Sequence, residues 1–237
     1  ISRDNPYVNK DFLIEQQKSL PKDIYEQEYN AEFTDAGQDV FTGVDDVCII
    51  KTWNGPRKGT RYYVGIDFGL ANDYSVLTVI DEFGRVSRVE RTNGSSYSEI
   101  AGTFSDIIRQ FSIAGGYAEI NGVGRPVFEM LHTKERKLKP FVTTNDTKNT
   151  GIHKLIYDIQ QQQVELPSKE LFPHLFHELS AYTYKINPSG LISFGAPNGI
   201  HDDCVMSLML ANQARTELGS ATGKLYIGNR HKGQVYQ

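Results

Sequence analysis

The sequence lacks the features that mark membrane proteins, secreted disulfide frameworks and phosphate-loop nucleotide hydrolases. No apolar run approaches the roughly 18 residues that a membrane span needs, and no charged-then-apolar signal segment opens the chain. The two cysteines, Cys48 and Cys204, lie far apart without metal-ligand spacing, so we expect free thiols in a reducing compartment. No Gly-x-x-x-x-Gly-Lys-Ser/Thr motif occurs, and we therefore expect no phosphate-loop ATPase in this chain.

The composition is that of a globular protein with an uneven charge distribution. The 237 residues are 39% hydrophobic and 11% aromatic, which is enough to bury a core. Residues 1–46 hold 11 acidic and 4 basic residues, a net charge of −7, so the remaining 191 residues carry +3 of the overall −4. The basic stretches are equally consistent with solvated faces and with patches that meet a phosphate backbone. Because the chain begins at Ile1 rather than Met, we expect a fragment or a processed chain.

The spacing of apolar residues predicts an α/β fold with a mixed sheet. Three successive strands with hairpin-length loops predict an antiparallel meander, and alternating helices and strands follow it. The expected strands are 61–68, 74–81, 85–92, 116–120 and 140–144, with a short pair 184–186 and 191–194, and the expected helices are 10–17, 21–33, 97–112, 123–137, 146–163, 169–182 and 201–218. This order predicts three antiparallel strands, then parallel ones, with helices on both faces. We expect an appendage over 1–46, one domain over 47–218 and a flexible tail over 219–237.

Acidic residues stand at the ends of these elements. Asp67 ends the first strand, Glu119 ends the fourth, and Asp202 and Asp203 open the last helix. Asp73 begins the second strand of the first hairpin and can approach Asp67 across it. Each residue alone also has a structural interpretation as a turn, cap or edge ion pair. His201 fits a cap, a ligand or a proton carrier.

The acids together favour a metal site over these separate structural roles. In a sheet of this order the ends of the first and fourth strands are neighbours, and the last helix can place its first turn beside them. Carboxylates gathered in this way repel one another unless a cation lies between them. Oxygen ligands suit Mg²⁺ or Mn²⁺ better than zinc. Two such ions roughly 4 Å apart support phosphodiester cleavage.

Three motifs resemble the nuclease domain of tailed-phage terminase large subunits, in the ribonuclease H-like, resolvase-type superfamily. They are Asp67-Phe-Gly69 with Asp73 and Ser75, Ala118-Glu119-Ile-Asn121-Gly122-Val-Gly124, and His201-Asp202-Asp203-Cys-Val-Met-Ser-Leu. The resemblance covers roughly residues 20–218, and the segment 24–33 is similar to the one that joins the family's ATPase motor to its nuclease. Without a phosphate loop, we expect the motor and its ATPase activity to be absent from this chain.

The resemblance implies an endonuclease that cuts concatemeric double-stranded DNA during genome packaging. It implies catalytic and metal-binding roles for Asp67, Glu119 and Asp203, shared by the neighbouring Asp202, with Asp73 as an extra metal ligand. His201 is an accessory candidate, and the DNA-binding candidates are Arg125, Arg136, Lys137, Lys139 and Lys148. The implied partners are DNA and, for the full-length protein, the small terminase subunit and the portal or procapsid, in the host cytoplasm and without a membrane.

Three alternatives remain open at this point. A related Holliday-junction resolvase or transposase would share the acids, and a silent DNA-binding or docking module would share the fold. The sequence Gly65-Ile-Asp67-Phe-Gly69 also resembles the phosphate-binding hairpin of actin- and sugar-kinase-type ATPases. That family needs a second Asp-x-Gly hairpin and a Gly-Gly adenosine loop, and neither is evident.

Overall fold

A five-stranded mixed sheet forms the centre of the molecule. The computed structural model describes residues 9–19, 29, 40–69, 73–93, 96–122, 124–186 and 192–220. The strands are β2 (Tyr62–Asp67), β3 (Ser75–Asp81), β4 (Val86–Thr92), β5 (Gly115–Glu119) and β6 (Leu138–Phe141), in the order β4-β3-β2-β5-β6. The first three strands pair antiparallel, whereas β5 is parallel to β2 and β6 is parallel to β5. The predicted sheet and the adjacency of its first and fourth strands are thereby confirmed.

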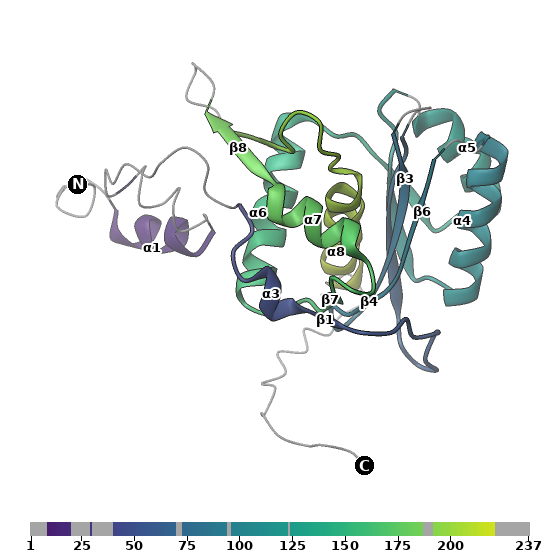
Figure 1. The fold of residues 1–237 in the computed structure, drawn as a ribbon, viewed down its shortest axis with the longest axis horizontal. Helices are drawn as coiled ribbons and strands as arrows, with labels where there is room; N and C mark the ends of the chain where they lie inside the picture. The colour runs from purple at the N-terminus through teal and green to yellow at the C-terminus, as the bar shows by residue number, and fades with distance from the viewer. Residues whose placement is uncertain are drawn as a thin grey trace, which may run out of the picture.

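Helices cover both faces of this sheet (Figure 1). One face carries α4 (Tyr97–Phe111) and α5 (Gly124–Lys134), and the other carries α6 (Asn145–Gln160), α7 (Pro173–Ala181) and α8 (Asp203–Ser220). Two apolar cores result, because alternate strand residues point to opposite faces. Val64 and Ile66 of β2 pack in the core under α4 and α5, whereas Tyr63 packs with α8.

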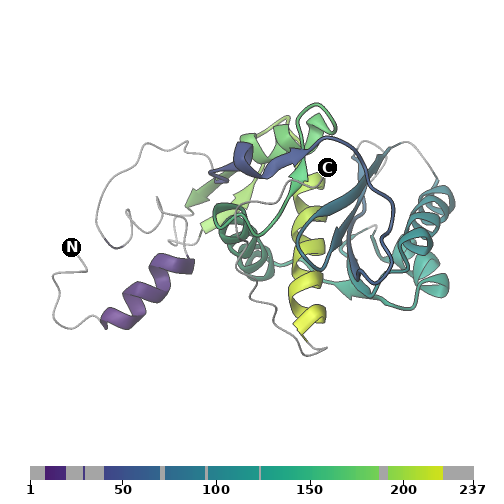
Figure 2. The same ribbon diagram turned by 90° about the horizontal axis from the view of Figure 1, so that it is seen from below.

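The helix α8 lies directly against β2, as the turned view also shows (Figure 2). The close approach requires glycine at position 65, because a Cβ there would lie 2.1 Å from both the Ala211 amide nitrogen and the Ser207 carbonyl oxygen. The Ser207 hydroxyl lies 3.0 Å from the Gly65 carbonyl oxygen and 2.9 Å from Thr78 Oγ1. These contacts fix α8 on the sheet, and with it the first residues of the helix.

Short elements complete the fold, and the sequence did not predict all of them. The strands β1 (Cys48–Ile50) and β7 (Leu166–Pro167) form a parallel pair, and α3 (Val44–Val47) precedes β1. Elements of two to four residues are too short to show a periodicity. The hairpin of β8 (Thr183–Ile186) and β9 (Ile192–Gly195) was predicted and is confirmed.

Residues ahead of position 47 also belong to the packed body. Val40, Phe41 and Val44 are buried in the core that contains α8, so packing of the body begins before residue 47. The helix α1 (Lys10–Ser19) contacts α6. The predicted helix over 21–33 lies outside the described residues except for Tyr29, and so does the predicted tail except for Gly219 and Ser220, which belong to α8.

Several predicted boundaries were wrong, among them the ends of the helices expected over 123–137 and 146–163, which stop at Lys134 and Gln160. The last helix begins at Asp203 rather than His201. The helix expected from residue 169 begins at Pro173, because proline is favoured in the first turn of a helix. The strand expected over 140–144 is β6, Leu138–Phe141, since Thr144 instead caps α6. Within the described residues both cysteines are free, and no helix has the length and apolarity to cross a bilayer.

Candidate functional site

Asp67 and Glu119 meet at one edge of the sheet. Each is the last residue of its strand, and the two strands are adjacent and parallel, with Ile66 paired to Ala118. Both side chains point to the α8 face, because Gly65 and Tyr117, two residues earlier, contact that side. A Cβ at Gly124 would lie 2.2 Å from the Glu119 carbonyl oxygen, so glycine lets α5 begin tightly against this strand end.

Both carboxyl groups have raised pKa values. Burial raises the pKa of Asp67 well above its usual value, and the charges of Glu119, Asp203 and Asp202 raise it further. The pKa of Glu119 is also raised by burial, although its hydrogen bond with Asp67 and the nearby Lys148 charge oppose that shift. Burial and the neighbouring charges therefore disfavour two ionised carboxylates at this edge, a cost that a bound cation would offset.

The start of α8 brings further carboxylates to this edge. Asp203 is the first residue of α8, and its Oδ2 accepts a hydrogen bond from the Tyr74 amide at 3.4 Å. Burial raises the pKa of Asp203 to about 6, while the Tyr74 amide and His201 oppose the shift. His201 Nδ1 lies 3.6 Å from Asp203 Oδ2 and 3.3 Å from Asp73 Oδ1. The imidazole thus bridges two acids.

Lys148 lies within the acidic cluster rather than on an outlying surface. Its Nζ is 3.0 Å from Asp202 Oδ2, and the side chains are 21% and 30% exposed. The first turn of α6 carries it there, after a capping box in which Thr144 and Thr147 satisfy each other's backbone amides. Asn121 ties the loops after β5 and β6 together by bonding the Thr143 backbone at 2.6 and 3.1 Å.

The sequence prediction missed a carboxylate that holds α8 in place. Glu178 of α7 is 3% exposed, and its Oε2 accepts hydrogen bonds from the Cys204 amide at 2.8 Å and the Val205 amide at 3.3 Å. It thereby caps the turn that presents Asp203. Burial raises the pKa of Glu178 to about 7. A glutamate inside a predicted helix gave no signal for this contact, which joins residues 26 positions apart.

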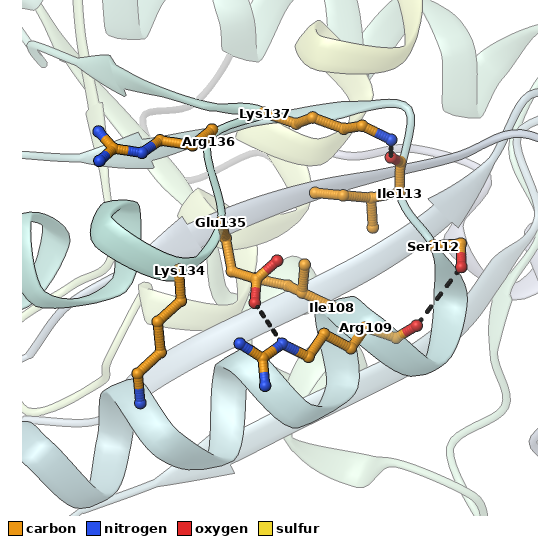
Figure 3. A pocket seen from close by; sticks show the side chains of 8 residues that line it. All are labelled: Ile108, Arg109, Ser112, Ile113, Lys134, Glu135, Arg136 and Lys137. Carbon is orange, nitrogen blue, oxygen red and sulfur yellow. Dashed lines mark hydrogen bonds and ion pairs between the residues drawn. The ribbon is translucent and has the colours of Figure 1, made fainter.

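The predicted DNA-binding residues do not form one surface. Arg125 lies exposed in the first turn of α5, close to the acidic edge. Lys139 lies exposed on the edge strand β6, opposite Tyr117 and so on the α8 face. Arg136 and Lys137 instead precede β6 at the other end of the sheet, where they line a pocket with Arg109 (Figure 3).

Two of the basic side chains that line this pocket are already engaged in contacts within the protein. Lys137 Nζ donates to the Ile113 carbonyl oxygen at 2.8 Å, and Arg109 pairs with Glu135 at 2.9 Å. The pocket lies at the start of β6, whereas Glu119 is paired with Phe141 at the end of β6. Arg136 and Lys137 are therefore a strand's length away from the acidic cluster and do not belong to it.

The cluster has the donor chemistry of a metal site but not a finished ligand geometry. Asp67, Glu119, Asp202 and Asp203 supply carboxylate oxygens, which suit hard divalent cations. In the described part of the chain, however, no three His, Cys, Asp or Glu side chains already form a group that would hold an ion. The Asp202 carboxylate already pairs with Lys148, and the Asp67 carboxyl group already hydrogen-bonds to Glu119. A cation would have to replace these contacts. Asp73, with 57% of its side chain exposed, lies at the rim.

Comparison with known proteins places this arrangement in a family. Residues 64–215 match the family model described as the terminase RNaseH-like domain. The large terminase subunits of Thermus phage G20c and Thermus virus P23-45 are each 29% identical over 215 residues. The match covers 85% of this chain and 43% of each relative, so the chain spans less than half of their length.

Solved structures agree with that match. The large terminase nuclease of thermophilic phage G20c superimposes with a TM-score of 0.66 at 28% identity, covering 74% of this chain and 97% of that one. The same nuclease with bound magnesium gives 0.67 at 28% identity, covering 75% and 98%. The predicted ribonuclease H-like fold is confirmed, and the chain belongs to the terminase RNaseH-like domain family.

Proposed function

We propose that this chain is a divalent-metal-dependent endonuclease that cleaves concatemeric double-stranded viral DNA during genome packaging. The observation that carries the proposal is the meeting of Asp67 and Glu119 at the ends of adjacent parallel strands, with Asp202 and Asp203 at the start of α8 beside them. Structures of the similar G20c nuclease with bound magnesium, cobalt or zinc support a divalent cation as the cofactor. The family match favours this function over the ATP-binding alternative.

Each acidic residue has a defined part in this proposal. Asp67, Glu119 and Asp203 would hold Mg²⁺ or Mn²⁺, with two ions in all, and Asp202 would assist. Bound there, the ions would supply activation of a water and stabilisation of the leaving oxygen. The protein's own contribution is to position the oxygens through β2, β5 and the capped start of α8. Because burial raises the pKa values of Asp67 and Glu119, metal binding would have to compete with protonation of these carboxylates.

The full-length protein would act with more partners than this chain contains. By analogy with the large terminase subunits it resembles, we propose that it works with a small subunit and a portal or procapsid in the host cytoplasm. The chain spans 43% of the length of those relatives, and because it has no phosphate loop we propose no motor or ATPase activity for it.

Cleavage of supercoiled plasmid tests the proposal. Wild-type protein should nick and linearise plasmid with Mn²⁺ or Mg²⁺ and leave it intact in EDTA. Asp67→Asn, Glu119→Gln and Asp203→Asn should each abolish cleavage, whereas Asp106→Asn, an exposed position on α4, should not. Intact plasmid across the whole metal series, or full activity in any of the three variants, would contradict the proposal.

A further inference from the structure

Arg91 lies in line with Asp67 across the sheet. In the register of the strands Asp67 is opposite Val76, and Val76 is opposite Arg91. Residues paired in this way share a face, and Val76 packs in the core that contains α8. Two strand spacings separate Arg91 from Asp67, or roughly 10 Å between backbones. The end of β4 therefore brings a cation to the acidic edge.

The guanidinium of Arg91 is held flat against an aromatic ring of the site. Its Cζ lies 3.2 Å from the centroid of the Tyr74 ring. Tyr74 also donates its amide to Asp203, and its ring meets the His201 ring edge-on, with the centroids 5.3 Å apart. Stacking fixes the plane of a guanidinium while its terminal N–H groups stay available for two oxygens of one anion, such as a phosphate.

Arg91 differs in its pairing from the other arginines of the sheet. Arg61, Arg85 and Arg88 form ion pairs with Glu82, Glu165 and Glu90 respectively. Among the residues that the structure describes, Arg91 has no such carboxylate. Its Nε is buried without a hydrogen-bond partner, as are those of Arg85 and Arg88. Burial raises the pKa of the Cys204 thiol, and the Arg91 charge opposes that shift, which places the guanidinium near the start of α8.

We propose that Arg91, stacked on Tyr74, binds a backbone phosphate of the DNA strand that enters the acidic site. A cluster of carboxylates repels DNA, and Lys148 is already paired with Asp202, so a free cation beside the cluster supplies the missing attraction. This inference rests on the proposed action on DNA.

Salt-dependent DNA binding tests the inference without requiring cleavage. Binding of a labelled duplex is measured by fluorescence anisotropy in EDTA from 50 to 200 mM salt. Loss of one phosphate contact lowers the slope of log K against log salt by about 0.9. Arg91→Gln should show that decrease and weaker binding. Arg88→Gln is the matched control, because Arg88 lies on the same strand, opposite Val79 on the other face, and pairs with Glu90.

A second variant separates the charge from the fold. Arg91→Lys keeps one cation, so its slope should match that of the wild type while its affinity falls with the loss of the planar stack. An unchanged slope in Arg91→Gln, an equal decrease in Arg88→Gln, or a Lys variant that behaves as Gln would each overturn the inference. If the Arg91→Gln slope falls while plasmid stays intact, the phosphate contact stands and the proposed nuclease function fails.

Discussion

Replacement of Asp203 by asparagine should abolish catalysis and yet stabilise the metal-free protein. The carboxylate lies in a half-buried cluster of like charges, and burial raises its pKa from 3.8 to about 6. Because the folded state binds this proton more tightly than the unfolded chain, stability falls as pH rises from 3.8 through about 6. Asparagine has the same shape and no charge to lose.

The size of the gain follows from that pKa difference. A change from 3.8 to about 6 corresponds to about 3 kcal/mol for the charged form, at about 1.4 kcal/mol per pKa unit. The asparagine oxygen still accepts the Tyr74 amide, but the attraction between Asp203 and His201 is lost. We therefore expect a net gain of about 1–2 kcal/mol above pH 7, which raises the Tm by roughly 2–8 °C for a domain of this size.

Thermal unfolding of both proteins in EDTA at pH 5 and pH 8 measures this effect. The gain should be full at pH 8 and about half as large at pH 5, because the unfolded chain loses this proton above pH 3.8 whereas folded wild-type Asp203 keeps it until about pH 6. Asp106→Asn, on the exposed side of α4, should change nothing at either pH. A variant that is no more stable than the wild type at pH 8, or equally stabilised at both pH values, would refute the argument.

Three further predictions concern the supports of the site. Gly65→Ala should lower the free energy of unfolding, measured by urea titration, by about 1–3 kcal/mol, because its Cβ would clash with α8. Gly102→Ala is the control and should not destabilise the protein, because its Cβ would meet no atom within 4 Å. Burial raises the pKa of Glu178 from 4.5 to about 7, so wild-type stability should fall between those pH values, and Glu178→Gln should flatten that part of the Tm profile. A double-mutant cycle of Lys148→Met and Asp202→Asn should give a coupling of roughly 0.5–1 kcal/mol, and zero coupling would show that the pair is not formed in solution.

The sequence was sufficient for the sheet and for the placement of two acids. The apolar run that ends at Asp67, and the short strand that ends at Glu119, each showed where a buried strand stops. Chain order then indicated that these ends are neighbours, and the register of β2 with β5 confirms it. The convergence of Asp202 and Asp203 on the same edge also followed from chain order, whereas their roles as ligands remain predictions.

Contacts between distant residues could not be predicted in the same way. Glu178 reaches the start of α8 from another helix, and Tyr74 meets Asp203 across 129 positions. The stack of Arg91 on Tyr74 depends on the register of β3 with β4 and on side-chain rotation. The sequence prediction grouped Arg136 and Lys137 with Lys148 only because all three are basic. In the fold, Arg136 and Lys137 lie before the start of β6, whereas Lys148 lies beyond its end, beside the acidic cluster.

The most direct test of the central claim is a crystal of this chain soaked in Mn²⁺ and measured at a wavelength where manganese scatters anomalously. We expect a peak between Asp67 and Glu119, with carboxylate oxygens at roughly 2.0–2.3 Å. We also expect the Asp67–Glu119 hydrogen bond to be replaced and Asp203 to turn toward the ion. An acidic edge without any peak at saturating Mn²⁺, with the Asp67–Glu119 pair intact, would contradict the proposed metal site.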